Sequence, residues 1–245
     1  MDNGFHLVEY SDQYWKSELP SARERGFGSN IARAAEVFMY ARREISAFVD
    51  IGAGPGFFSE AIRGLLPEIS DLFWGVEKFP PPNNIRPLPD KQFVVGGISD
   101  MPIDYIDAGI CVEVIEHLTP KMVFNLFKEL AIKSRNDSCF LFNTGLPKYV
   151  KEEDRGYMDP LGRGHVLSWS VSGLNHLIRE LGFQAIPLPG KTWAMIVEYR
   201  PTEKLELTTR IWKPIPATMN RLAGSKYGNL FRILGTESYR AYADY

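Results

Sequence analysis

Short apolar runs alternate with longer amphipathic stretches along most of this chain. Apolar runs bounded by Gly, Pro or Asp predict strands, and apolar residues spaced three and four apart predict helices. Strands are expected near residues 47–51, 72–76, 92–95, 107–112, 138–143, 184–187 and 192–199. Helices are expected near residues 57–66, 121–133 and 171–181. Because strands and helices alternate, the pattern predicts an α/β protein with a doubly wound sheet flanked by helices.

The segment before the first strand, residues 1–46, is interpreted as an N-terminal helical cap and not as a separate domain. Its apolar residues recur at helical spacing from Ile31 to about Ile45, and Asn30 is expected to be the N-cap. Upstream lies an aromatic-rich set that could cover the mouth of a pocket: Tyr10, Tyr14, Trp15 and Phe27. Core packing is the favoured role of each aromatic residue, and ligand contact is the alternative.

Two segments differ in composition from the rest of the central domain, residues 47–200. Residues 144–164 are rich in Gly and Pro, and a loop of this length in a compact domain is usually functional or disordered, so we expect it to close over a substrate. Residues 200–245 carry eight basic and four acidic residues with interleaved aromatics. This C-terminal extension, residues 201–245, is expected to pack on the core or on a second subunit, or else to contact an anionic substrate.

Composition narrows the class of protein. A chain of 245 residues with 44% hydrophobic content can bury one large core. Its formal net charge of −2 lacks the basic excess of general nucleic-acid binders, which disfavours nucleic acid as a partner. The sequence has no apolar run of about 18 residues to predict a transmembrane helix, and no signal peptide is expected. Cys111 and Cys139 are expected as buried, reduced thiols, which fits a cytoplasmic location.

A glycine-rich turn follows the first expected strand, where the sequence reads FVDIGAGPG. Glycine lets the backbone approach a ligand closely, and the acid before the turn suits a ligand with a cationic end. Glu77 ends the second expected strand, where an acid in nucleotide-binding folds accepts hydrogen bonds from ribose hydroxyls. The candidate cofactor-binding residues of these two motifs are Asp50, Gly52, Ala53, Gly54, Gly56 and Glu77.

On these two motifs, residues 45–200 resemble the Rossmann-like (class I) S-adenosylmethionine-dependent methyltransferases. The resemblance implies a seven-stranded sheet, mostly parallel with one antiparallel strand, and S-adenosylmethionine bound across the carboxyl ends of the first strands. It places the adenine contact near Ile98 and Ser99, because Gly97 stands where the family commonly has an acid, and Asp100 is a weaker candidate. Cys111, at the end of the fourth strand, is a further candidate for cofactor contact.

A second group of polar residues follows the fourth expected strand, in the stretch EVIEHL. If a helical turn starts there, Glu113, Glu116 and His117 share one face, and His165 follows the long loop. Two carboxylates and two imidazoles would suit Mg²⁺, Mn²⁺ or Fe²⁺. The stretch and the later histidine resemble metal-dependent O-methyltransferases, including the 3′-terminal small-RNA 2′-O-methyltransferases and those of the ubiquinone pathway.

Three roles stay open for this group. The four residues could hold a metal ion, or His117 or His165 could act as a base with Glu116 beside it, or they could be structural. In the second case Glu113 would face the cofactor. A hydroxyl is a poor nucleophile at neutral pH and needs either a metal ion or a base to activate it. The presence of this group therefore favours oxygen as the methyl acceptor.

The leading hypothesis is an O-methyltransferase that acts on a hydroxyl of a small metabolite or glycan. If the polar group holds a metal ion, Mg²⁺ or Mn²⁺ would assist the methyl transfer. The alternative enzyme is an RNA 2′-O-methyltransferase. The alternative without catalysis is a scaffold that binds the cofactor.

Overall fold

The described part of the chain folds around one mixed β-sheet. The computed structural model describes residues 11–83, 86, 91–203 and 206–212. The strands are β1 (Phe48–Ile51), β2 (Phe73–Glu77), β3 (Phe93–Val95), β4 (Ile106–Val112), β5 (Ser134–Asn143), β6 (Phe183–Pro187) and β7 (Ala194–Tyr199). Their order is β3-β2-β1-β4-β5-β7-β6, and β7 alone runs antiparallel to its neighbours in this seven-stranded sheet. The expected fold, mostly parallel with one antiparallel strand, is confirmed.

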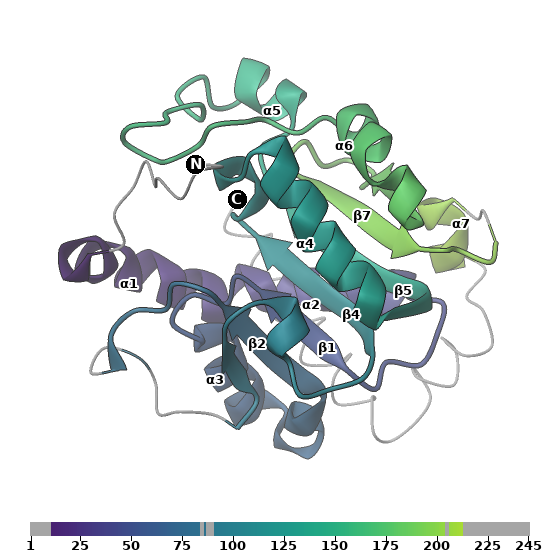
Figure 1. Cartoon of the computed structure of the whole chain (residues 1–245), viewed down its shortest axis with the longest axis horizontal. Helices are drawn as coiled ribbons and strands as arrows, with labels where there is room; N and C mark the ends of the chain where they lie inside the picture. The colour runs from purple at the N-terminus through teal and green to yellow at the C-terminus, as the bar shows by residue number, and fades with distance from the viewer. Residues whose placement is uncertain (1–10, 84–85, 87–90, 204–205, 213–245) are drawn as a thin grey trace.

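Helices cover both faces of the sheet. The helices α2 (Ser29–Tyr40) and α3 (Phe57–Leu65) pack on one face, and α4 (Pro120–Lys133) and α6 (Val171–Ile178) pack on the other. In Figure 1, α4 crosses in front of the sheet and α2 lies behind it. Successive strand residues point to opposite faces, so Phe48 joins the core beneath α2 whereas Val49 joins the core beneath α4. Burial on both faces explains why these strands read as continuous apolar runs.

The ends of α2 differ from the sequence prediction. Gly28 occupies the N-cap position without a side-chain hydrogen bond, and Asn30 lies inside the first turn, where its Oδ1 accepts a hydrogen bond from Arg33 Nη1. The helix ends at Tyr40, because Ala41 adopts extended backbone angles. Ile45 is nevertheless buried in the core that α2 covers. The apolar spacing therefore predicted burial correctly but extended the helix too far.

A long helix that the sequence analysis did not predict, α1 (Asp12–Phe27), precedes α2. Ser11 caps it by accepting a hydrogen bond from the Tyr14 backbone amide, and Pro20 lies inside it. The helix packs on α3, where a Cβ atom on Gly26 would come within 2.7 Å of Phe57 Cβ. Its largely polar sequence lacks a clear apolar stripe, which is the reason that periodicity did not reveal it.

The remaining elements are short. They are α5 (Pro147–Glu152), α7 (Leu207–Trp212) and the 3-10 helices η1 (Pro67–Leu72), η3 (Ile98–Asp100), η4 (Ile115–His117) and η5 (Arg179–Leu181). The segment expected as a loop, residues 144–164, thus contains the helix α5. Cys111 and Cys139 lie on the adjacent strands β4 and β5, and both are buried and form no disulfide, as expected. No helix in the described ranges has the length and apolar character needed to cross a membrane.

The described start of the C-terminal extension packs on the core through a buried ion pair. Arg210 of α7 donates to both carboxylate oxygens of Glu198, at 2.6 and 2.9 Å, and also to the backbone carbonyl of Tyr40. This contact supports the packing role for residues 207–212. The predicted domain boundaries, after residues 46 and 200, stay predictions. The predicted homo-oligomer and the predicted contact with an anionic substrate concern residues 201–245, of which residues 213–245 lie outside the described residues.

We predict that Arg210→Ala lowers the free energy of unfolding by about 3–5 kcal/mol, the usual cost of removing one partner of a buried ion pair. Among the described residues, Glu198, whose side chain is 1% exposed, would keep an ion pair only with the more distant Arg42 guanidinium, at 3.5 Å. Urea unfolding measures the loss, and Arg179→Ala, at an exposed position, is the control. A loss below about 1 kcal/mol, the range of surface ion pairs, would contradict the packing of α7 on the core.

Candidate functional site

A cavity of about 550 Å³ opens at the carboxyl ends of β1, β2 and β4. Six of the residues predicted to bind a cofactor line it: Asp50, Gly52, Ala53, Gly54, Glu77 and Ile98. Tyr14 and Trp15 of α1 also line the cavity, and Trp15 is 7% exposed. These two aromatic residues therefore belong both to the packing of α1 and to the wall of the cavity.

The glycine turn between β1 and α3 brings the backbone of Gly52 and Gly54 to the cavity wall. Gly52 and Gly54 have φ angles of +77° and +53°, in the left-handed region that favours glycine. A Cβ atom on Gly52 would lie 2.4 Å from Val114 Cγ2, so a side chain cannot fit there. A Cβ atom on Gly54 would meet nothing nearer than the Trp15 indole, at 3.9 Å. The space beside Gly54 is thus open for a ligand.

The Glu77 carboxylate is held at the edge of the cavity by two backbone amides. Its Oε2 accepts a hydrogen bond from Gly54 N at 2.9 Å, and its Oε1 accepts one from Phe79 N at 2.8 Å. Carboxylate oxygens have further lone pairs, which can accept hydrogen bonds from ligand hydroxyls. The same bonds tie the glycine turn to the end of β2.

Asp50 lies beneath the glycine turn and is 3% exposed. Burial, and secondarily the negative charge of Glu77, raise the pKa of Asp50 to about 7. A positive charge in the cavity would favour the ionised carboxylate and oppose this shift. The site is therefore electrostatically suited to a ligand that carries a cationic group.

The other four candidates for cofactor contact, including the weaker candidate Asp100, do not line the cavity. Cys111 faces the core beneath α4, because side chains alternate along β4 and the next residue, Val112, lines the cavity instead. Gly56 is the N-cap of α3, with φ +89°. Ser99 lies next to Ile98 and donates a long hydrogen bond, of 3.4 Å, to Glu129. Asp100 accepts a hydrogen bond from the Gly97 amide and so holds the local turn.

The chain after β4 does not form the helical turn that the sequence analysis expected. Glu113 has a φ angle of +54°, and the 3-10 helix η4 begins only at Ile115. Glu113 is therefore not on one helical face with Glu116 and His117. Its carboxylate lines the cavity, where it accepts a hydrogen bond of 2.5 Å from Asn143 Nδ2, and Arg33 donates in turn to Asn143 Oδ1.

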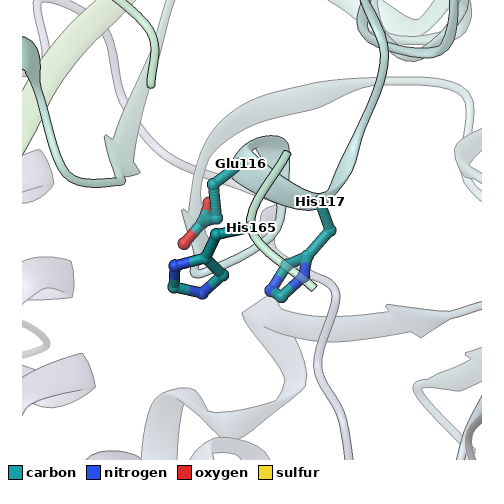
Figure 2. A group of neighbouring side chains, drawn as sticks. All are labelled: Glu116, His117 and His165. Atoms are coloured by element: carbon teal, nitrogen blue, oxygen red, sulfur yellow. The ribbon is translucent and has the colours of Figure 1, made fainter. Parts of the chain in front are cut away.

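Glu116, His117 and His165 converge beside this cavity. One ligand atom from each lies within 4.8 Å of the other two, and Glu113 is not part of this group. Figure 2 shows the Glu116 carboxylate and both imidazole rings turned toward one another. The ring centroids of the two histidines are 4.8 Å apart. Backbone hydrogen bonds from Val166 and Leu167 to the Glu116 carbonyl bring the distant histidine to η4.

Burial sets the charge states of this group. Burial, and then the neighbouring His165, lower the pKa of His117 to about 4. Burial also lowers the pKa of His165. Burial and the nearby Glu113 carboxylate raise the pKa of Glu116 well above its usual range. At neutral pH the two histidines are therefore neutral and offer lone pairs, and a cation would favour ionised Glu116.

Three residues of this region escaped the sequence analysis as functional candidates. Tyr157 donates a hydrogen bond to Glu116 Oε1, and Arg33 and Asn143 orient Glu113. The only sequence feature that pointed to Tyr157 was its place in the Gly- and Pro-rich segment 144–164. No local sequence pattern pointed to Arg33 or Asn143. Each acts through a contact between residues that are distant in sequence, which periodicity does not report.

Comparisons with known proteins concern the fold. No protein-family model matches the sequence, and a search of curated proteins finds no match. Among solved structures, the protein in complex with the Haloferax volcanii Trm112 methyltransferase activator aligns with a TM-score of 0.53 at 15% identity, over 79% of this chain and 99% of that chain. Human N-acetylserotonin methyltransferase, in complex with SAM, aligns with a TM-score of 0.52 at 14% identity, over 78% and 57%.

A third structure carries a small-molecule ligand. The O-methyltransferase family 2 protein from Planctomyces limnophilus, in complex with apigenin, aligns with a TM-score of 0.51 at 12% identity, over 80% of this chain and 62% of that chain. The fold is the Rossmann-like methyltransferase fold. Its structural neighbours are S-adenosylmethionine-dependent methyltransferases and include O-methyltransferases. This chain spans about three fifths of the length of the human and P. limnophilus proteins.

Proposed function

We propose that this protein is an S-adenosylmethionine-dependent O-methyltransferase that acts on a hydroxyl of a small metabolite or glycan, with a divalent cation beside the acceptor oxygen. One observation carries the proposal. His117 both lines the cavity that begins at the glycine turn and belongs to the cluster with Glu116 and His165. A cofactor in the cavity and an acceptor held at the cluster would therefore meet at His117.

The cavity suits S-adenosylmethionine, which supplies an activated methyl group on its sulfonium when bound. Gly54 leaves room for the methionine part, and buried Asp50 favours its ammonium group. Glu77 would accept hydrogen bonds from the ribose hydroxyls. Ile98, which lines the cavity beyond β3, would contact the adenine. The work of these residues is to hold the methyl group in line with the acceptor.

The cluster suits a divalent cation better than it suits a general base. A carboxylate with two neutral imidazoles is a donor set typical of Mn²⁺ or Fe²⁺. Glu116 Oε2 is buried and has no hydrogen-bond donor among the described residues, so it is available as a ligand. An imidazole such as His117, with a pKa near 4, is a weak base at neutral pH. Glu113 is assigned to the cofactor side, because it lines the cavity outside the group of three.

The direct test is methyl transfer from labelled S-adenosylmethionine into a panel of sugars, phenols and RNA, with Mn²⁺ or Mg²⁺ present. We expect a labelled methyl ether on a sugar or phenol. If the label appeared only on RNA 2′-hydroxyls, RNA would replace the small metabolite or glycan as the proposed acceptor. Cofactor binding without transfer to any of these acceptors would favour the non-catalytic scaffold.

The affinity for S-adenosylmethionine should fall as the pH is lowered below about 7. In the free protein Asp50 is then protonated, because its pKa is about 7, whereas the cationic cofactor favours the ionised carboxylate. Binding must release this proton, so the association constant should fall by up to about tenfold per pH unit below that pKa. Calorimetry between pH 5.5 and 8 measures the slope.

Asp50→Asn is the matched variant, because it cannot titrate and should flatten this pH dependence. Asp71→Asn, at an exposed position, should keep the wild-type slope. An equal slope in the wild type and in Asp50→Asn would remove Asp50 as the origin of the effect.

A further inference from the structure

Tyr157 connects the segment after β5 to the acid of the cluster. Its side chain is buried, with the residue 4% exposed. The hydroxyl donates to Glu116 Oε1 at 2.9 Å and accepts from the Gly145 backbone amide at 2.7 Å. Because Oε1 is held in this way, Glu116 presents its other oxygen, Oε2, without a hydrogen-bond donor among the described residues. One tyrosine thus fixes which oxygen of the carboxylate is free to act.

The backbone of the same segment contacts both histidines. His165 Nδ1 lies 2.8 Å from the carbonyl oxygen of Tyr157, and His117 Nδ1 lies 3.2 Å from the carbonyl oxygen of Gly164. A carbonyl oxygen only accepts hydrogen bonds, so each neutral imidazole must carry its proton on Nδ1. The lone pair of each ring is then on Nε2. Histidines that bind metals commonly show this arrangement, with the other nitrogen donating to a carbonyl or carboxylate.

We infer that Tyr157 is the positioning residue of a cation site formed by Glu116, His117 and His165, an inference that rests on the proposed function. Its hydroxyl orients the carboxylate, its carbonyl sets the tautomer of His165, and its ring packs on the His165 imidazole with the centroids 4.3 Å apart. Residues 157–164 therefore hold three ligands in place through two carbonyls and one hydroxyl. Positioning by such contacts reduces the reorganisation that cation binding requires.

The inference predicts a selective effect, because Tyr157 does not line the cofactor cavity. Tyr157→Phe keeps the ring and the backbone carbonyl and removes only the hydroxyl. We expect it to weaken Mn²⁺ binding by about 10- to 100-fold, the usual loss when a contact to a metal ligand is removed. Its affinity for S-adenosylmethionine should stay within about twofold of the wild type, because the glycine turn and Glu77 are unchanged.

The experiment is a titration of the whole chain with Mn²⁺, followed by electron paramagnetic resonance, for the wild type, Tyr157→Phe and Tyr149→Phe. Tyr149 is the control, because it lies in the same segment and its ring contacts that of Tyr157 edge-on. We expect Tyr149→Phe to bind like the wild type. Equal affinity in the wild type and Tyr157→Phe would overturn this inference alone. Absence of Mn²⁺ binding in the wild type would overturn the cation in the proposed function, and this inference with it.

A second measurement needs no variant and covers the case in which Tyr157→Phe does not fold. Nitrogen-15 spectra of the imidazoles in the wild-type protein distinguish the two neutral tautomers. We expect both His117 and His165 to carry their proton on Nδ1. A proton on Nε2 of either ring would overturn the assignment of residues 157–164 as the positioning segment.

Discussion

Gly54→Val is expected to abolish measurable binding of S-adenosylmethionine, with a loss in affinity of at least about 100-fold. Gly54 has a φ angle of +53°, where a β-branched residue is strongly disfavoured. Its Cβ position also faces the cavity, so the valine side chain would occupy the space that we assign to the methionine part. Isothermal titration calorimetry measures the loss, and circular dichroism confirms that the variant folds.

Glu77→Ala tests the other end of the same site. We expect it to weaken cofactor binding by about 5- to 150-fold, which corresponds to the 1–3 kcal/mol of a hydrogen bond to a charged group. Part of the loss would come from the Gly54 amide, which donates to this carboxylate. Glu68→Ala, at an exposed position on η1, is the matched control and should bind normally. Full affinity in both Gly54→Val and Glu77→Ala would sink the assignment of the cavity to S-adenosylmethionine.

The second large effect concerns the cation. Excess chelator should abolish methyl transfer, and Mn²⁺ or Mg²⁺ should restore it. Glu116→Ala, His117→Ala and His165→Ala should each lower kcat by about 100-fold or more, because these residues would hold a cation that would supply stabilisation of negative charge on the acceptor oxygen. Cofactor affinity should persist in Glu116→Ala and His165→Ala, because neither residue lines the cavity.

The general-base alternative makes different predictions. Chelators would then have no effect, one histidine substitution would dominate, and the rate would fall below the pKa of that histidine. The pKa of His117, near 4, would place this fall well below neutral pH. Full activity in excess chelator, with a metal-free elemental analysis, would remove the cation and leave His117 or His165 as the base.

The two sites depend on parts of the chain with different sequence signals. The glycine turn and Glu77 are local features at strand ends, and parallel strands bring their carboxyl ends to one edge of a sheet. Their meeting in space follows from the fold class. The fold class does not determine the position of His165. This residue lies 48 residues after His117, and its position depends on the path of residues 144–164. Its arrival beside Glu116 was a hypothesis from the sequence, and the structure shows it.

The sequence by itself determined the alternation of strands and helices from the first strand to the seventh and the position of the glycine turn, and the mixed sheet was implied by the family resemblance. The physical reason is that apolar runs must be buried, and that the period of burial differs between strands and helices. Only the tertiary structure decided the fine arrangement of the site. The positive φ angle of Glu113 takes it off the helical face expected for Glu116 and His117, and the side-chain alternation of β4 turns Cys111 into the core. The hydroxyl of Tyr157 reaches Glu116 across 41 residues, a contact that depends on the path of the folded chain and leaves no periodic trace in the sequence.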